Sequence, residues 1–217
     1  MAKLIELTRY IATFATSPLA QWAELDPWAL TSQSAKVVRE MISTLSVRDF
    51  TIKNEVAVHR DATVEPGAII KGPIVLSAGC FIAAGAYLRG GNWLGENCTI
   101  GPGSEVKSSF IFPGSKLAHF NFVGDSIIGS DVNLEAGSIV CNYRNEREIK
   151  EIRVRMNRRL HSTGCEKFGA VIGDNCRIGA NAVIAPGALL IPGMFLGRTQ
   201  LCDQELEVLP RGAEENA

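Results

Sequence analysis

Two cations and one histidine in the middle of the chain have types and spacing suited to anion binding and proton transfer. Arg89 and Lys107 are separated by three times six positions, and His119 follows Lys107 by twice six. If three six-residue steps make one turn of a regular fold, the cations stack on one face and form an anion site, most simply for a phosphate. The alternative is a pair of solvated surface cations. A lone histidine is more often structural, yet imidazole is the side chain best suited to take a proton near neutral pH.

A six-residue repeat predicts the element that would position these side chains. Apolar residues recur at every sixth position, namely Val58, Val64, Ile70, Leu76, Ile82, Leu88, Leu94, Ile100 and Val106, then Ile172, Ile178, Ile184, Leu190 and Leu196. This period fits neither an α-helix nor a lone amphipathic strand, and it indicates a parallel β-helix. Four positions later the residue is usually small, as an interior corner requires. Cys80, Cys98 and Cys176 occupy such positions, so we expect them to be small core residues.

The repeat loses one residue at two places beside His119. The steps from Val106 to Ile111 and from Val123 to Ile128 are five positions instead of six, which shortens two turns by one residue each. Such an irregularity re-aims the neighbouring side chains, as bulges do in sheets. We interpret it as a functional device; the alternative is drift in a tolerant repeat.

The chain divides into a helical N-terminal segment (1–50), a β-helix (51–200) and an acidic C-terminal segment (201–217). The spacing of Leu4, Leu7, Ile11 and Phe14 predicts one helix, and apolar residues within 37–45 predict a second. Asp26 and Pro27 predict a helix start, with Asp26 as its cap. We expect these helices to cover the open end of the β-helix, and the C-terminal segment to be a loose tail.

A basic insertion interrupts the repeat at residues 144–167. Its alternating stretch "IRVRM" predicts a projecting β-ribbon that turns near Asn157. Two interpretations stand equally: a solvated surface loop, or an arm that binds phosphate or coenzyme.

Composition excludes several classes of function. The chain has 217 residues, of which 46% are hydrophobic and 21% charged, with a net charge of −1. A net charge this close to zero does not indicate a protein that binds nucleic acid or an anionic membrane through an overall positive charge. No apolar run approaches the roughly 20 residues that span a bilayer. None of the six cysteines forms a CxxC pair, so no metal site of that type is expected. We expect a cytoplasmic protein.

The motif around His119 resembles a known family. The repeat is similar to that of hexapeptide-repeat acyltransferases, whose fold is a left-handed parallel β-helix. The stretch "EVKSSFIFPGSKLAHFNFVGDSIIGSDVNLEAGSIVCNY" resembles the acetyltransferase domain of the bifunctional N-acetylglucosamine-1-phosphate uridyltransferase/glucosamine-1-phosphate acetyltransferases. "KFGAVIGDNCRIGANAVIAPG" is similar to later coils of archaeal-type sugar-1-phosphate nucleotidyltransferases that carry the same terminal domain. The uridyltransferase half has no counterpart in this sequence.

The resemblance implies an acetyl-CoA-dependent N-acetyltransferase acting on an amino-sugar phosphate, and it implies a role for each matching residue. His119 matches the general base that deprotonates the sugar amine, a role an acetyl transfer to an amine requires. Arg89 and Lys107 match the family's cations that hold the sugar phosphate, and Asn133 and Asn142 match residues that orient the sugar and its amine. Tyr143 matches a residue that makes a backbone contact, and Ala136 matches a residue that contacts acetyl-CoA. No metal is implied. The family also implies a homotrimer with active sites between neighbouring β-helices.

Three departures from the family pattern leave the acceptor open. Phe122 stands where family members use a tyrosine on the phosphate, Arg144 and Asn145 replace an acid and a glycine, and the following loop is longer. One rival is therefore a non-catalytic sugar-nucleotide-binding or regulatory subunit with the same fold. The other rival is a γ-type carbonic anhydrase, which needs three converging histidines; His59, His119 and His161 include no close pair.

Overall fold

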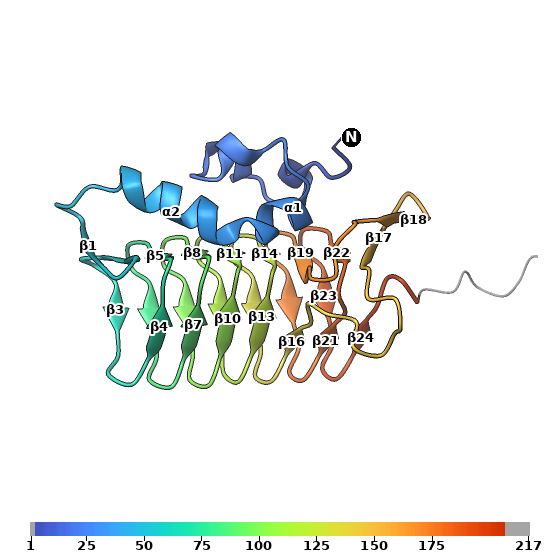
Figure 1. Cartoon of the computed structure of the whole chain (residues 1–217). Coiled ribbons are helices and arrows are strands. Elements are labelled where there is room, and N and C mark those ends of the chain that lie inside the picture. Colours follow the sequence, from blue (N-terminus) through green and yellow to red (C-terminus); the bar gives the residue numbers. More distant parts are fainter. Residues whose placement is uncertain (1–2, 207–217) are drawn as a thin grey trace, which may run out of the picture.

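Short parallel strands wind into three sheets around a common axis, with a layer of helices along one side (Figure 1). The computed structural model describes residues 3–206. Sheet A contains, in spatial order, β1 (Phe50–Lys53), β2 (Val56–His59), β5 (Ile74–Leu76), β8 (Asn92–Leu94), β11 (Phe110–Ile111), β14 (Ile127–Ile128), β19 (Ala170–Ile172) and β22 (Ala188–Leu190). Its first pair, β1 and β2, is antiparallel, and its other neighbours are parallel.

The other two sheets complete each coil. Sheet B contains β3 (Thr63–Val64), β6 (Phe81–Ile82), β9 (Thr99–Ile100), β12 (Lys116–Leu117), β15 (Asn133–Leu134), β20 (Arg177–Ile178) and β23 (Phe195–Leu196). Sheet C contains β4 (Ile69–Lys71), β7 (Tyr87–Arg89), β10 (Glu105–Lys107), β13 (Phe122–Gly124), β16 (Ile139–Val140), β21 (Val183–Ile184) and β24 (Leu201–Cys202). The predicted left-handed parallel β-helix is confirmed.

The six-residue apolar positions form the interior of this β-helix. Leu88, Ile100 and Val106 are fully buried, as are most of their counterparts in the other coils. The three interior cysteines, Cys80, Cys98 and Cys176, are at most 1% exposed, which confirms their prediction as small core residues. At the N-terminal end the interior is open, and Val64 is 36% exposed there.

The shortened steps both lie at the corner where the chain passes from sheet C to sheet A. Val106 pairs with Val123, and Ile111 pairs with Ile128, so each of these coils is one residue shorter than the regular ones. The tighter corner is made by Ser108 and Asp125, which have φ angles of 48° and 47°. The insertion leaves at the same corner, because Val140 pairs with Ile184 in the next coil.

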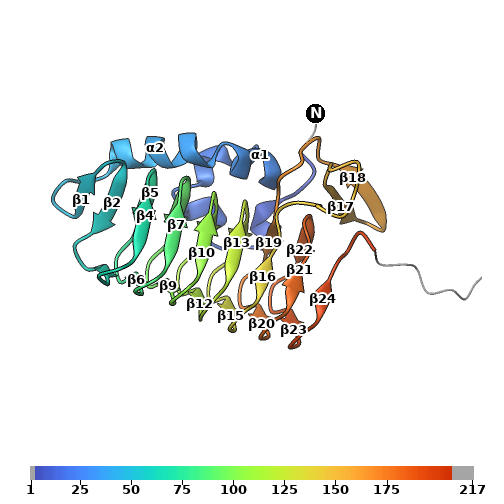
Figure 2. The ribbon, with the colours of Figure 1, turned by 60° about the horizontal axis from the view of Figure 1, so that its bottom comes forward.

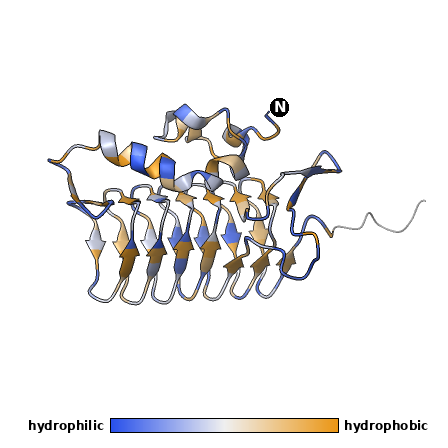
Figure 3. Ribbon diagram, in the orientation of Figure 1, coloured by the Kyte–Doolittle hydropathy of each residue, from blue (hydrophilic) through white to orange (hydrophobic). Residues whose placement is uncertain are grey.

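The helical layer lies along sheet A and does not cover the end of the β-helix, so that expectation is wrong (Figure 2). The α-helices are α1 (Pro27–Ser32) and α2 (Ser34–Thr44), and α2 contacts β5 and β8. From β5 onward, each strand of sheet A places one apolar residue outward as well as apolar residues inward. Helix α2 is amphipathic, with an apolar side and a polar side (Figure 3). The outward set is Val75, Trp93, Phe110, Ile127, Val171 and Leu189. A solenoid face with this pattern needs a covering layer to remove it from water.

The first predicted helix is instead a series of 3₁₀ turns, namely η1 (Leu7–Arg9), η2 (Phe14–Thr16) and η3 (Ala20–Trp22). Leu7, Ile11 and Phe14 are nonetheless buried, because single turns also place residues three to four apart on one side. The helix start at Pro27 is confirmed. However, the carboxylate of Asp26 does not cap α1; it accepts the backbone N–H groups of Leu4 and Ile5 at 2.8 and 3.0 Å.

The insertion forms a ribbon of β17 (Arg153–Met156) and β18 (Arg159–Ser162), which turns at Asn157 and Arg158 as predicted. The ribbon packs against the last coils, where Ile152 and Val154 are fully buried. The expectation of a loose tail from residue 201 is wrong for residues 201–206, because β24 closes sheet C there. Residues 207–217 lie outside the described residues.

Candidate functional site

The register of sheet C places three cations in one column. Lys71 pairs with Arg89, and Arg89 pairs with Lys107, so their side chains leave the same face in successive coils. Adjacent strands are about 4.8 Å apart. The predicted stacking of Arg89 and Lys107 is therefore confirmed, and the column is one cation longer than expected.

Each of the two predicted phosphate ligands has a carboxylate partner in the next coil. Nε of Arg89 donates to Oε1 of Glu105 at 2.6 Å. Nζ of Lys107 donates to both carboxylate oxygens of Asp125, at 3.0 and 2.9 Å. These ion pairs remove most of the repulsion between stacked cations. An incoming anion must therefore compete with Glu105 and Asp125.

Asp125 joins Lys107 to Asn142. Its side chain is 8% exposed, and Nδ2 of Asn142 donates to its Oδ2 at 2.5 Å. One buried carboxylate thus fixes the direction of a cation and of an amide from two different coils. The sequence reasoning missed both carboxylates. The available signal was their spacing, because Glu105 and Asp125 follow Arg89 and Lys107 by about one coil.

Gly124 leaves the space in which this cluster forms. A Cβ atom at Gly124 would lie 2.6 Å from Nδ2 of Asn142 and 2.8 Å from Cζ of Phe122. Both distances are too short for nonbonded atoms, so any other residue would displace the amide or the ring. The para carbon of Phe122 consequently lies beside the polar cluster, where a tyrosine hydroxyl would reach it.

His119 lies at the opposite edge of sheet C, in the turn that enters β13 from sheet B. It precedes Gly124, the register partner of Lys107, by five residues, which span at most about 18 Å. The side chain is exposed and makes no hydrogen bond or ion pair within residues 3–206. Nothing in those residues fixes the imidazole, so it is free to turn toward the face of β13.

Ala136 occupies the corner position beside His119 in the next coil. Leu117 pairs with Leu134, and the two residues follow these strand partners by two positions each. The backbone N–H of Gly137 donates to the carbonyl of His119 at 2.9 Å. The residue expected at the coenzyme is therefore a direct neighbour of the expected base.

Asn133 and Tyr143 are not part of this cluster. Asn133 lies on sheet B, in register with Lys116 and Arg177. Tyr143 follows Asn142 into the insertion; it is 36% exposed, and Nζ of Lys150 lies 5.6 Å from its ring centroid. The structure thus brings together Arg89, Lys107 and Asn142, with His119 and Ala136 at the far edge of the same face.

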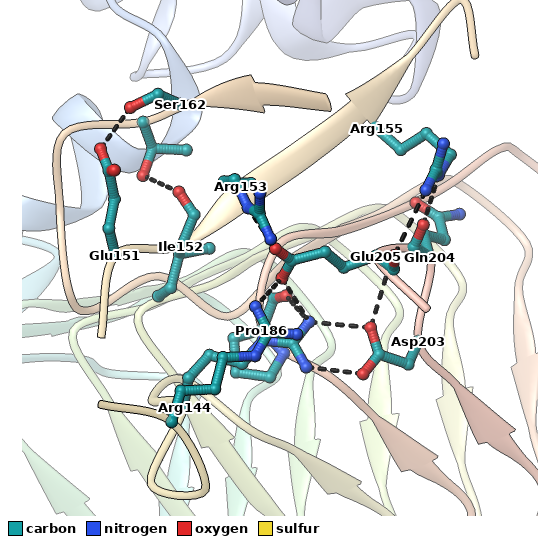
Figure 4. A network of polar contacts seen from close by, with 12 residues as sticks. Arg144, Glu151, Ile152, Arg153, Arg155, Ser162, Pro186, Asp203, Gln204 and Glu205 are labelled. Atoms are coloured by element: carbon teal, nitrogen blue, oxygen red, sulfur yellow. Dashed lines mark hydrogen bonds and ion pairs between the residues drawn. The ribbon is translucent and has the colours of Figure 1, made fainter. Parts of the chain in front are cut away.

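Three arginines of the insertion form ion pairs with Asp203 and Glu205 in the segment that follows β24 (Figure 4). Arg144, which is 2% exposed, donates to Asp203 at 2.6 and 2.8 Å. Glu205 forms ion pairs with Arg144, Arg147 and Arg153. These arginines are neither part of a solvated loop nor free to bind an anion, the two interpretations of the insertion, because their ion pairs connect it to the segment after the last coil.

This cluster shifts the pKa of two of its members. Hydrogen bonding to Asp203 raises the pKa of Arg144 above its ordinary value, against the effect of burial. Burial favours the neutral form of Asp203, but the hydrogen bond and charge of Arg144 outweigh it and lower the pKa of that carboxyl. Both groups are therefore held in their charged forms.

Within the described part of the chain, no three His, Cys, Asp or Glu side chains come together as metal ligands. His59 is in sheet A, His119 at the edge of sheet C and His161 in the ribbon. Within the described part of one chain, the three histidines therefore do not converge. No helix between residues 3 and 206 is long and apolar enough to cross a bilayer.

Comparison with known proteins confirms the predicted hexapeptide repeat. The family model described as the hexapeptide repeat of succinyl-transferase matches residues 169–190. A bifunctional sugar-1-phosphate nucleotidylyltransferase/acetyltransferase of Sulfurisphaera tokodaii is 39% identical over 153 residues, which cover 68% of this chain and 38% of that protein. The bifunctional protein GlmU of Methanococcus maripaludis is 31% identical over 187 residues, which cover 83% of this chain and 44% of that protein.

The chain therefore spans less than half the length of these curated relatives. Among solved structures, it is similar to the acetyltransferase domain of PglB from Neisseria gonorrhoeae in complex with acetyl coenzyme A. That likeness has 20% sequence identity and a TM-score of 0.41, and it covers 81% of this chain and 75% of the other.

Proposed function

From the premise that the chain is a hexapeptide-repeat protein related in sequence to bifunctional acetyltransferases, we propose that it transfers an acetyl group from acetyl-CoA to an amino-sugar phosphate. The observation that carries the proposal is the face of sheet C. Its one edge holds Arg89, Lys107 and Asn142, and its other edge holds His119 beside Ala136. We assign the part shared with the relatives to their acetyltransferase activity, because the β-helix offers no glycine-rich phosphate loop for nucleotide chemistry.

In this proposal the acceptor sugar lies across β13. Its phosphate displaces Glu105 and Asp125 from the two cations, and its amine faces His119. The amine nitrogen attacks the carbonyl carbon of the thioester, and its proton passes to His119. The C–S bond then breaks, and protonated His119 returns the proton to the departing thiolate, so that coenzyme A leaves as a thiol and the base is regenerated. Ala136, as a small side chain, leaves room for the thioester at this corner.

The proposal includes a homotrimer in which a neighbouring β-helix completes the coenzyme site. Sheet C carries an outward apolar column, Phe122, Ile139, Val183 and Leu201, that the helical layer does not cover. Leu201 in this column is 60% exposed in the single chain. A second copy of the chain would bury it and would place a wall opposite the exposed His119. Asn133 and Tyr143, which lie away from the cluster, would then contact the acceptor from the edges of this shared cleft.

The test is a screen of amino-sugar 1-phosphates with acetyl-CoA, in which the release of free thiol is measured. Arg89→Ala and Lys107→Ala should raise KM for a phosphorylated acceptor about tenfold or more, since each removes a charge-assisted contact worth about 1.5–3 kcal/mol. KM for the unphosphorylated sugar should change little, and Lys36→Ala on the exposed side of α2 is the matched control. Equal effects on both sugars would exclude a phosphate contact.

The rival function, a non-catalytic sugar-nucleotide-binding subunit, is favoured by one observation. Phe122 lacks the hydroxyl that the family pattern places beside the polar cluster. Tight binding of a sugar nucleotide without thiol release from any acceptor would support this rival and contradict the enzyme.

A further inference from the structure

A hollow of about 440 Å³ lies on the sheet A side of the β-helix, a different face from the sheet C site. The end of α2 and residues of the 3₁₀ segment form its roof, the β1–β2 hairpin forms one wall, and the coils of sheet A form its floor. Its volume is within the usual range for small-molecule sites, about 300–1,000 Å³. It lies on the outer face of sheet A under the helical layer, whereas Lys107 and His119 belong to the face of sheet C, and it shares no lining residue with the proposed site.

Aromatic side chains form much of its apolar lining. Phe50 and Trp93 both line the hollow, together with Met41 and Val75. Trp93 is 5% exposed and packs edge-on against Phe112, with ring centroids 5.1 Å apart. Its indole N–H makes no hydrogen bond within residues 3–206. It is not among the buried unpaired polar atoms of those residues, so it is open to solvent and can donate to a bound molecule.

The charge around the hollow is negative. Two carboxylates, Asp49 and Glu96, line it, and no lysine or arginine does; His59 also lines it and lies 3.5 Å from the carboxylate of Asp61. Asp49 is paired with Arg60 at 3.1 Å, but Glu96 makes no side-chain hydrogen bond or ion pair in the described part of the chain. Phosphates and other anions are therefore disfavoured here, and a cation would find an unpaired partner in Glu96.

We propose that this hollow is a binding site for a small organic cation, namely a protonated amine on an aromatic or apolar body. The body packs between Phe50 and Trp93, where burial of apolar surface favours it. The ammonium group pairs with Glu96 and gains a cation–π contact with the indole ring. Ser77, whose hydroxyl makes no hydrogen bond within residues 3–206, supplies a further polar contact at the rim.

Three probes with the same ring and different charge test this assignment. Benzylamine, benzyl alcohol and benzoate are titrated into the full chain by calorimetry, and the indole N–H signal of Trp93 is followed by NMR. Benzylamine should bind saturably at one site and shift that signal. Benzyl alcohol should bind about tenfold more weakly, because it lacks the charge-assisted contact, and benzoate should not bind.

Two variants locate the site. Glu96→Gln should weaken benzylamine binding about tenfold and leave benzyl alcohol unchanged. Because the Glu96 side chain is exposed, the thermal unfolding temperature of Glu96→Gln should match that of the wild type. Glu40→Gln, an exposed carboxylate on α2 outside the hollow, is the matched control and should bind benzylamine like the wild type. Equal binding of all three probes, no saturable binding, or an unchanged affinity in Glu96→Gln would each overturn the proposal. The acetyl-transfer assay would be unaffected by any of these outcomes.

Discussion

Lys107 and Asp125 form a two-pronged ion pair at the corner where the coil is one residue short. Both carboxylate oxygens accept from the ammonium, at 3.0 and 2.9 Å, and one of them also accepts from Asn142. Asp125 can take this position because its backbone, with a φ of 47°, turns the chain within the shortened step. The break in the repeat thus places a buried acid between two proposed binding residues.

Replacing Asp125 by asparagine should separate acceptor binding from turnover. Asp125→Asn keeps the shape but removes the charge that neutralises Lys107, so inorganic phosphate and a phosphorylated acceptor should bind several-fold more tightly. Asn142 loses its charged partner, and kcat should fall about tenfold. Calorimetry with phosphate and steady-state kinetics measure the two effects, with Glu148→Gln in the exposed insertion as control. A purely structural role would instead lower stability and leave both KM and kcat unchanged.

A hydroxyl added to Phe122 should strengthen binding of the phosphorylated acceptor. The para carbon lies beside Asn142, so Phe122→Tyr places a donor within the polar cluster. One additional hydrogen bond of about 0.5–1.5 kcal/mol corresponds to a KM about two- to tenfold lower. Phe195→Tyr, on an exposed ring of sheet B, should have no effect. A raised KM in Phe122→Tyr would indicate that the site selects against this hydroxyl.

Loss of His119 should affect chemistry and leave folding unchanged. Removing a general base typically lowers the rate about 10² to 10⁴-fold, so kcat of His119→Ala should fall by at least the smaller factor. Because the side chain is exposed and unpaired in the described residues, the thermal unfolding temperature should not change. Added imidazole should restore part of the rate, whereas His161→Ala should need no rescue. A variant as active as the wild type would reduce His119 to a surface residue.

Arg144→Ala should destabilise the C-terminal coil. It leaves Asp203 and Glu205 with side chains 7% and 2% exposed and without one cation. Breaking a buried ion pair from one side costs about 3–5 kcal/mol, measurable by denaturant unfolding. Arg158→Ala at the exposed ribbon turn is the control and should change the free energy of unfolding by less than about 0.5 kcal/mol.

The same ion pair gives stability a defined dependence on pH. The pKa of Asp203 is lower in the folded protein than its ordinary value of 3.8. Its contribution to stability is therefore fully present above that value and is lost as the pH falls through the lowered pKa. Unfolding free energies measured between pH 6 and pH 3 should decrease in the wild type more steeply than in Asp203→Asn. Parallel curves would show that the pairing contributes nothing to acid stability.

The sequence predicts the interior of the β-helix well because every sixth residue must face the axis, whatever lies outside. It also predicts that Arg89 and Lys107 stack, since their register follows from the coil length alone. The position of the helical layer could have been predicted too: Val75, Trp93 and Phe110 precede core residues and are apolar, which indicates a covered face. The prediction that the helices cover the end of the β-helix was wrong because it was based on the open end alone and did not include the outward apolar residues of sheet A.

The spacing of about one coil marks Glu105 and Asp125 as possible partners of the two cations, but it does not decide whether the ion pairs form. Glu105 and Asp125 are neighbours of Arg89 and Lys107 only once a full coil has closed, and the choice between solvent and a partner depends on side-chain direction. The same holds for Arg144, because the whole insertion and the last coils separate it along the chain from Asp203 and Glu205. Charge patterns counted along the chain do not show such pairings.

The insertion also weakens the cooperativity of unfolding between the coils that precede it and the coils that follow it. Elsewhere, residues that pair between neighbouring coils are separated along the sequence by one coil. Across the insertion they are separated by one coil plus the insertion, as are Val140 and Ile184. In a one-dimensional array each coil is stabilised by its neighbours, so the interface with the greatest loop-closure entropy is where cooperativity is weakest. The N-terminal layer bridges this interface, because Asp174 accepts the backbone N–H groups of both Ala12 and Ser130. Amide hydrogen exchange should therefore divide the protein into two blocks that meet at residues 140 and 170 and that the hydrogen bonds of Asp174 connect through the segment preceding α2.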